Sequence, residues 1–277
     1  MQERPLMFMP KRDGVGAFSP TTYLAIAAHM DDIEIMAIDG ILKAQADPES
    51  HFSGVVLTDG RGSPRKGAFA TVSDQEMVKI RTKEQARAAL IGGYSSIQVL
   101  GYSSDTLKIP NNEKFIADLV EVISGIEPDV IYTHSLADKH ATHVAVCLRV
   151  IEALRRGTSK PLKAFIGCEV WRGLDWLPDE DKVLMDVSGK PELQKELLRA
   201  HRSQTLGGKN YVKAVMGRRA ANATFLDPYA TELADSLVYG VDLMPLLETP
   251  ELEPLEYMRK LTTKFQEEML GLIERLQ

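Results

Sequence analysis

The sequence has few of the features that mark secreted, membrane-spanning or nucleic-acid-binding proteins. Its 277 residues include only two cysteines, Cys147 and Cys168, each in an apolar run, so we expect reduced core side chains rather than a disulfide. No segment approaches the ~18 apolar residues of a membrane span. The apolar stretch 6–9 is too short for a signal peptide. These absences predict a cytoplasmic setting and no integral membrane segment.

An excess of positive charge is also lacking. The chain has 33 Lys and Arg against 39 Asp and Glu, a formal charge of −6. Binding to duplex nucleic acid depends on neutralising phosphates, so we expect no nucleic-acid partner. A hydrophobic content of 44% is that of an ordinary globular protein. We predict one domain over residues 1–277, with a core over about 20–220 and a mostly helical extension over 225–277.

Apolar runs alternate with helical patterns along most of the chain. The run 23–28 is apolar at both odd and even positions, which is typical of a parallel strand covered on both faces. Further strands are expected at 53–57, 97–100, 129–133, 164–170 and 182–187, and helices at 35–46, 74–91, 113–126, 140–155, 192–200 and 209–219. The alternation predicts an α/β fold, a Rossmann-like, doubly wound, mostly parallel sheet with helices on both faces.

Two other segments carry separate expectations. Residues 59–73 are rich in Gly, Ser, Lys and Arg, which indicates a mobile loop. The C-terminal segment spaces its apolar residues by three and four, as one face of a long helix does: Leu255, Met258, Leu261, Phe265, Met269, Leu272 and Leu276. The simplest interpretation is a helix packed on the domain's own core. A contact in a homo-oligomer is the alternative.

Four of the six histidines fall in two short segments, each following a predicted strand. Residues 28–34 read Ala-His-Met-Asp-Asp-Ile-Glu, and residues 133–143 read Thr-His-Ser-Leu-Ala-Asp-Lys-His-Ala-Thr-His. Either segment alone is explained by helix capping, because carboxylates stabilise a helix N-terminus. Together they point to a metal. Ligands in doubly wound sheets bind beyond the carboxyl ends of strands, and zinc hydrolases use three His or carboxylate ligands with one open position.

These segments resemble the LmbE-like (PIG-L) family of zinc-dependent N-acetylglucosamine deacetylases. The family signature is Ala-His-Pro-Asp-Asp followed much later by His-Pro-Asp-His, and residues 28–32 and 140–143 match it in order. Weaker similarities follow at 58–60 (Thr-Asp-Gly), 81–84 (Arg-Thr-Lys-Glu), 169–171 (Glu-Val-Trp) and 201–204 (His-Arg-Ser-Gln). The match departs from the signature at Met30, and at Ala141 and Thr142, which replace Pro and Asp.

The resemblance implies a role for each residue of the two segments. His29, Asp32 and His143 would bind one Zn²⁺ per chain, or another divalent ion such as Fe²⁺. Asp31 would be the general base for a zinc-activated water. His140 would stabilise the oxyanion or protonate the leaving amine. Asp138 and His134 are expected to support these imidazoles as outer partners of the metal site.

The same resemblance implies a small amino-sugar-type substrate. Arg81 resembles the arginine that the family places near the sugar. Arg61 and Arg65 lie on the 59–73 loop, where they would either meet an anionic group of the substrate or remain solvated. The predicted reaction is hydrolysis of an N-acyl group, acetyl first of all.

Three other functions stay open from the sequence. One is an amidase acting on a larger thiol-sugar conjugate, and another is a two-metal phosphohydrolase, because paired Asp and His occur there as well. The third is a nucleotide- or sugar-binding module without catalysis. Against that module, no Gly-x-Gly-x-x-Gly follows the first strand, and the acidic segment that stands there would repel a pyrophosphate.

Overall fold

The computed structural model describes residues 6–8, 21–157 and 160–277, and eight strands in these ranges form one sheet. The spatial order of the strands is β1-β4-β3-β2-β5-β6-β8-β7. Their bounds are β1 (Leu6–Phe8), β2 (Tyr23–Ala27), β3 (Phe52–Thr58), β4 (Ser96–Tyr102), β5 (Val130–His134), β6 (Ala164–Cys168), β7 (Lys182–Asp186) and β8 (Leu237–Asp242).

The middle of the sheet is parallel and its edges are antiparallel. Strands β4, β3, β2, β5 and β6 run in one direction, whereas β1 pairs antiparallel with β4, β8 with β6, and β7 with β8. Taken in chain order, the five parallel strands lie in the spatial order 3-2-1-4-5, which is that of the Rossmann fold. The predicted fold class is confirmed.

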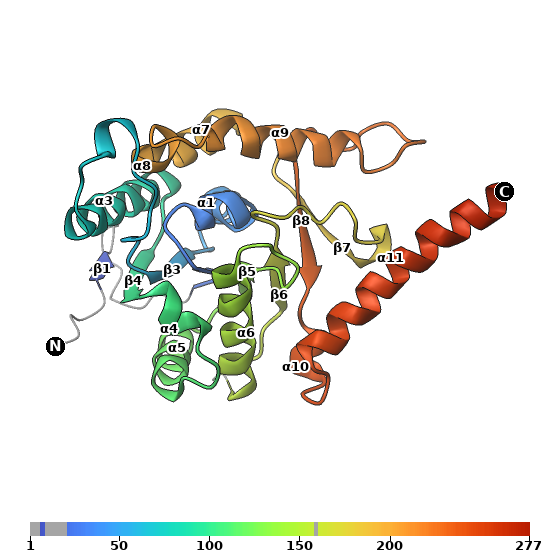
Figure 1. Cartoon of the computed structure of the whole chain (residues 1–277), viewed down its shortest axis with the longest axis horizontal. Coiled ribbons are helices and arrows are strands. Elements are labelled where there is room, and N and C mark those ends of the chain that lie inside the picture. The colour runs from blue at the N-terminus through green and yellow to red at the C-terminus, as the bar shows by residue number, and fades with distance from the viewer. Residues whose placement is uncertain (1–5, 9–20, 158–159) are drawn as a thin grey trace.

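Helices cover both faces of the sheet (Figure 1). In chain order they are α1 (Asp32–Met36), α2 (Ile38–Ala46), α3 (Asp74–Gly92), α4 (Ser104–Lys108), α5 (Glu113–Ile126), α6 (Ala141–Arg155), α7 (Pro191–Ala200), α8 (Arg202–Thr205), α9 (Tyr211–Thr224), α10 (Pro245–Glu248) and α11 (Pro254–Leu276). Figure 1 places α3, α7 and α9 on one side of the sheet and α5 and α6 on the other, while α11 projects away from it.

The two large core clusters lie on opposite faces of the sheet, because successive side chains of a strand point to opposite sides. On β2, Leu24 and Ile26 pack with residues of α5 and α6. Ala25 and Ala27 of the same strand pack on the other face, against α1, α2 and α7. This two-sided burial explains why the sequence of the strand is apolar at every position.

Helix α3 is fixed at both ends by its own sequence. Ser73 and Glu76 form a capping box, in which each side chain accepts the other's backbone N–H, and Gly93 ends the helix at φ 68°. The buried face of α3 is unusual, since it carries Arg81, Glu84 and Gln85. A helix that buries an arginine and a carboxylate has polar partners on the elements it covers, and these belong to the candidate site.

Most predicted elements are confirmed, and the differences have local causes. The expected helix 35–46 is two helices, α1 and α2, separated at Ala37, whose φ of −112° is not helical. Strands β1 and β8 were not predicted. The short β8 lies within 225–277, which was expected to be mostly helical, and Gly240 interrupts its apolar pattern. A Cβ on Gly240 would lie 2.5 Å from Ile166 Cγ2, so close packing on β6 requires the glycine.

Two further predictions concern membrane-spanning segments and the state of the two cysteines. No helix of the described ranges is both long and apolar enough to cross a membrane. Cys147 and Cys168 are buried and unbridged, and burial raises the pKa of each thiol. The prediction of reduced core cysteines is confirmed.

Candidate metal centre and active-site cavity

The two histidine segments meet where the strand order reverses. Strands β2 and β5 are parallel neighbours. The ring of His134, at the end of β5, accepts a hydrogen bond from the backbone N–H of Ala28, 106 residues earlier in the chain. His29 follows β2, His134 ends β5, and His143 lies in the first turn of α6. The carboxyl ends of both strands therefore deliver imidazoles to the same point, as the doubly wound topology predicts.

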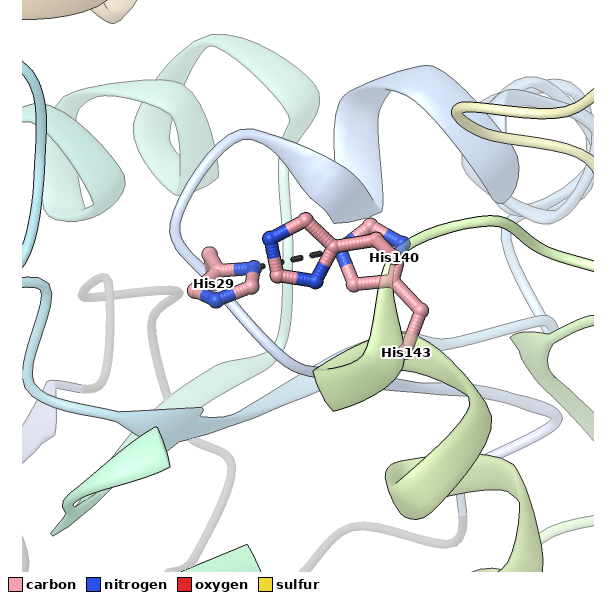
Figure 2. A group of neighbouring side chains, drawn as sticks. All are labelled: His29, His140 and His143. Atoms are coloured by element: carbon pink, nitrogen blue, oxygen red, sulfur yellow. Dashed lines mark hydrogen bonds between the residues drawn. The ribbon is translucent and has the colours of Figure 1, made fainter. Parts of the chain in front are cut away.

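Three donor atoms converge there in a nearly equilateral triangle. His29 Nδ1 lies 3.1 Å from Asp32 Oδ2 and 3.2 Å from His143 Nε2, and the latter two atoms are 3.3 Å apart. Figure 2 shows the rings of His29 and His143 turned toward each other, with His140 beside them. His29, Asp32 and His143, whose atoms form the triangle, are the three residues predicted from the sequence as ligands.

The triangle has the size that a small divalent cation requires. Ligand atoms at the ~2.0–2.2 Å distances typical of zinc, in a tetrahedral arrangement, lie about 3.3–3.6 Å from one another. The observed spacing of 3.1–3.3 Å is close to that range. Two imidazole nitrogens and one carboxylate oxygen also match the donor sets of catalytic zinc sites. The residues present therefore fit a single divalent ion.

Asp138 fixes the orientation of His143. Its Oδ2 lies 3.2 Å from His143 Nδ1, and the same carboxylate accepts the backbone N–H groups of His140 and Trp171. With the Nδ1 proton donated to Asp138, the Nε2 lone pair of His143 points at the triangle. A carboxylate behind a ligating histidine sets its tautomer and raises its basicity.

His134 lies at the base of the site, and its Nε2 atom already accepts a hydrogen bond from the backbone. Its Nε2 is 3.5 Å from Asp32 Oδ2, but it accepts the backbone N–H of Ala28 at 2.9 Å. Its ring stacks on His143 with the centroids 3.8 Å apart. Burial and His143 hold the pKa of His134 well below its usual range. A neutral ring whose Nε2 already accepts a hydrogen bond supports the site without offering it a free lone pair.

The charges around the triangle favour a cation within it. Burial lowers the pKa of His143, but the carboxylates of Asp32 and Asp138 outweigh it and raise that pKa to about 9. Burial likewise raises the pKa of Asp32, but His143 and His134 hold it well below its usual range. In the chain alone, a proton on His143 supplies the positive charge, and a divalent ion would take its place.

Asp31 points elsewhere because its backbone turns. Its φ of 94° and ψ of −26° place it in the left-handed region, which costs a non-glycine residue about 1–2 kcal/mol, least for Asn and Asp. This turn sends the adjacent carboxylates of Asp31 and Asp32 in different directions. Asp31 Oδ2 lies 3.3 Å from Arg81 Nη2. Burial raises the pKa of Asp31, and Arg81 offsets only part of this effect.

Buried polar side chains of α3, of α8 and of His201, which lies between α7 and α8, hold the 29–34 segment in place. Arg81 donates to the Met30 carbonyl and lies 3.4 Å from Glu84, whose two oxygens accept the backbone N–H and hydroxyl of Ser203 at 2.6 and 2.7 Å. Gln85 links Asp31 N to Glu34, which lies 2.9 Å from His201 Nε2. The weak sequence similarities at 81–84 and 201–204 are thus one connected support.

The triangle opens into a cavity of about 670 Å³. Asp31, Asp32 and His29 line it, whereas His143 is fully buried beneath. His140 forms another part of the wall, where burial and His143 lower its pKa to about 4, so its ring is neutral near pH 7. Among the described residues, His140 Nδ1 has no hydrogen-bond partner. A neutral imidazole beside the cavity can donate a hydrogen bond to a ligand.

Comparison with known proteins finds a family match over the part of the chain that holds the site. The family model of the GlcNAc-PI de-N-acetylases (PIG-L) matches residues 24–154, from β2 to the end of α6. The matched range contains the whole donor triangle and Asp31.

One curated protein and one solved structure are also similar to the chain. A probable N-acetyl-alpha-D-glucosaminyl L-malate deacetylase 2 of Bacillus subtilis is 25% identical over 189 residues, 66% of this chain and 83% of the relative. The N,N'-diacetylchitobiose deacetylase of Pyrococcus horikoshii is 17% identical with a TM-score of 0.65, over 86% of this chain and 88% of that chain. The predicted resemblance is confirmed.

One structural neighbour shows that this fold is compatible with a different reaction. GalB of Pseudomonas putida, a 4-carboxy-2-hydroxymuconate hydratase, has a TM-score of 0.59 at 17% identity, over 80% of this chain and 96% of that chain. The fold alone therefore does not determine the reaction. The choice depends on the groups that line the cavity.

The three arginines predicted to bind substrate have different surroundings. Arg81 is buried and lines the cavity, where it braces Asp31. Arg61 also lines the cavity but pairs with Asp59, which accepts from its Nε at 2.6 Å. Arg65 bonds to three carbonyls of residues 61–72 and to Asp74, and the cavity lining does not include it. The side chain of Arg65 therefore stabilises its own loop by these hydrogen bonds.

Of the three positions that depart from the family signature, Met30 and Thr142 are buried and Ala141 is exposed. Met30 is inaccessible to solvent, and its Sδ lies close to Gly60, where an added Cβ would approach it to 3.1 Å. Thr142, also buried, lines the cavity with its short side chain. Neither residue displaces a member of the donor triangle. Their effect is on the shape of the cavity and on what packs under the loop at Gly60.

Several residues that line the cavity were not predicted from the sequence. Trp171 lines it, with Lys209 Nζ 5.0 Å above its ring and Tyr211 in edge contact at 6.3 Å. Trp176, Tyr94 and His201 do not belong to the lining. Arg218 and the segment 103–108 complete it. Tyr211 and Arg218 share a helix, α9, whose cavity-facing positions carry no motif that a single sequence reveals.

Replacing Asp138 with asparagine is expected to weaken metal binding by about 10–100-fold, because an amide orients His143 less strongly and does not increase its basicity. Titration with Zn²⁺ against a competing chelator measures the change. Asp105→Asn, which alters an exposed carboxylate on the cavity rim, is the matched control and should bind as the unmodified chain does. Equal Zn²⁺ affinities for the two variants would show that Asp138 does not support metal binding.

Proposed function

We propose that this chain is a metal-dependent hydrolase that removes an N-acyl group, in the first place N-acetyl, from a small amino-sugar-type substrate. The observation that carries the proposal is the triangle of His29, Asp32 and His143 donor atoms beside the acidic group of Asp31. The match of residues 24–154 to the PIG-L family model supports it, as do two similar proteins whose names describe deacetylation of N-acetylated sugars.

The metal site is proposed to hold one ion per chain, Zn²⁺ in the first place, although the same donors accept Fe²⁺. A second grouping of Asp32, His134 and His143 shares two of its three ligands with the triangle, and His134 Nε2 already accepts a hydrogen bond. This argues against the two-metal phosphohydrolase. When bound, such an ion polarises an amide carbonyl and lowers the pKa of water to about 7.

The residues around the triangle divide the proton transfers of amide hydrolysis between them. Asp31, with its raised pKa, accepts a proton from the attacking water as the new C–O bond forms. It then delivers that proton to the nitrogen as the C–N bond breaks, so that carboxylate and amine leave. His140 donates a hydrogen bond to the oxygen that becomes negative in the transition state. Arg81 keeps the Asp31 carboxylate in place.

The cavity is proposed to accept the sugar against Trp171. A volume of about 670 Å³ exceeds what one acetylated sugar fills, and the lining includes Trp171 and four residues of the segment 103–108 besides His29 and Asp32. This extent is the observation that keeps a larger amide conjugate as the second candidate. Product analysis separates the two: acetate with free amine for the first, a larger acid with amine for the second.

Trp171→Ala is expected to raise KM about tenfold with little change in kcat, because the indole contacts parts of the substrate that do not react, and a loss of ~1.4 kcal/mol of uniform binding has this effect. Steady-state kinetics of amine release measure it. Trp176→Ala is the control, since Trp176 packs against Phe265 and not in the cavity. A fall in kcat alone would place Trp171 among the groups that act in the transition state.

The proposal as a whole is tested by metal analysis of the purified chain combined with an amine-release assay over N-acetylhexosamines and their glycosides. We expect about one divalent ion per chain, loss of activity with a chelator, and recovery when Zn²⁺ is added. Two ions with phosphate release would favour the phosphohydrolase. Hydration of an unsaturated acid without amine release would favour the reaction named for the structural neighbour GalB.

A further inference from the structure

The C-terminal helix α11 carries an apolar face that the rest of the chain does not cover. Of its residues, only Leu261 is buried. Beyond Phe265 the side chains of Met269, Leu272, Ile273 and Leu276 are each more than 40% exposed, and Leu276 is 78% exposed. A contiguous set of large exposed apolar side chains on one element marks an interaction surface.

Only the first half of α11 is held by the body of the protein. Tyr257 donates to the Asp242 carbonyl, Lys264 pairs with Asp181 at 2.7 Å, and Phe265 lies edge-on to Trp176 with the centroids 6.2 Å apart. Figure 1 shows the second half projecting beyond the sheet edge at β7. The expectation of a helix packed along its length on the domain core is therefore correct for the first half and wrong for the second.

The exposed positions repeat as those of a coiled coil do. Phe265, Met269, Leu272 and Leu276 follow one another by steps of four, three and four residues, the spacing of the a and d positions of a heptad. Such residues form one stripe along a helix, which a second helix can cover. The charges beside the stripe then decide what kind of helix fits.

One acid and one cation flank the stripe in the projecting half of α11. Glu268 and Arg275 are seven residues apart and therefore lie on the same side of the helix. Within the described part of the chain, Glu268 and Arg275 form no ion pair. An antiparallel partner of the same sequence can bring Glu268 of one copy beside Arg275 of the other.

We infer that the projecting half of α11 pairs antiparallel with α11 of a second copy of this chain, forming a two-fold symmetric dimer. In the register that matches both features, Met269 lies against Leu272 of the second copy and Phe265 against Leu276 of the second copy. Glu268 then lies beside Arg275 of the second copy. Symmetry repeats each contact, so the surface is self-complementary and the assembly closes at two chains.

A lipid surface fits the same stripe less well. Helices that lie on anionic membranes carry Lys and Arg on their polar face, whereas three of the four charges beyond Phe265 are carboxylates. The helix pair is short, so its interface is at the small end of specific protein contacts. We therefore expect a reversible dimer whose population increases with concentration.

Sedimentation of the full chain over a concentration series tests the pairing. The unmodified chain should dimerise, and Leu272→Glu should weaken the dimer at least tenfold. Leu270→Glu is the matched control, because Leu270 is 43% exposed on the same helix but lies off the stripe. Both variants should retain the circular dichroism and amine-release activity of the unmodified chain, since neither residue lines the cavity.

Charge exchange tests the register. Glu268→Arg alone and Arg275→Glu alone should each weaken the dimer, and the double variant should restore it. A chain that stays monomeric at every concentration would overturn the inference, as would equal effects of Leu270→Glu and Leu272→Glu or a double variant that fails to recover. Co-sedimentation with vesicles containing anionic lipid, lost in Leu272→Glu, would assign the stripe to a membrane instead.

Discussion

His143→Ala is expected to abolish metal binding together with activity. The ring is one of three donors, and it is the one that Asp138 orients, so its loss leaves a site with two ligands. We expect metal affinity to fall by more than the roughly 10–100-fold that removal of an outer partner costs. Titration with Zn²⁺ and metal content after dialysis measure the loss.

Two companion variants decide which donors complete the set. His29, His140 and His143 also lie close enough together to form an alternative group. If the triangle with Asp32 is correct, Asp32→Ala loses the ion while His140→Ala retains it and loses turnover. The reverse result, with the ion lost from His140→Ala and kept by Asp32→Ala, would replace Asp32 by His140 in the site.

Asp31→Asn is expected to keep the metal and lose about 10²–10⁴-fold in kcat, the usual contribution of a positioned acid or base. Asparagine has nearly the same size and tolerates the left-handed backbone that Asp31 adopts, so the local fold should persist. Single-turnover kinetics with a fixed metal load measure the loss directly.

The control for this variant is Asp59→Asn. Asp59 is a second carboxylate in the cavity lining, and it too is paired with an arginine, Arg61, but it lies outside the donor triangle. Its replacement should leave kcat within a few-fold of the unmodified chain. An Asp31→Asn enzyme with near-normal kcat would exclude Asp31 as the base, and equal losses in both variants would point to general electrostatics.

The agreement between the sequence and the donor triangle has a topological basis. His29 and His143 are 114 residues apart, yet each follows a strand whose apolar run was recognisable. Parallel neighbouring strands end at the same edge of the sheet, so locating β2 and β5 was enough to bring the two segments together. The spacing of His140 and His143 then placed both rings on one side of the α6 N-terminus.

Other features could not be predicted, because they depend on contacts between distant segments. Arg65 was a candidate for substrate binding, but its guanidinium is used by the carbonyls of its own loop and by Asp74. His134 was correctly placed beside the site, yet only its hydrogen bond from Ala28 shows that its lone pair is occupied. Side-chain direction and competition for partners are not encoded in residue spacing.

The sequence by itself determined the doubly wound fold, the positions of the two histidine segments and the apolar stripe of the C-terminal helix. Each of these features follows from the spacing of apolar residues or from a short motif within one segment. Only the tertiary structure decided that Asp31 turns away from Asp32, that Arg81 and Gln85 brace it, and that the body leaves half of α11 uncovered. These properties depend on which surfaces the folded chain brings into contact, since burial and hydrogen bonding are settled by packing.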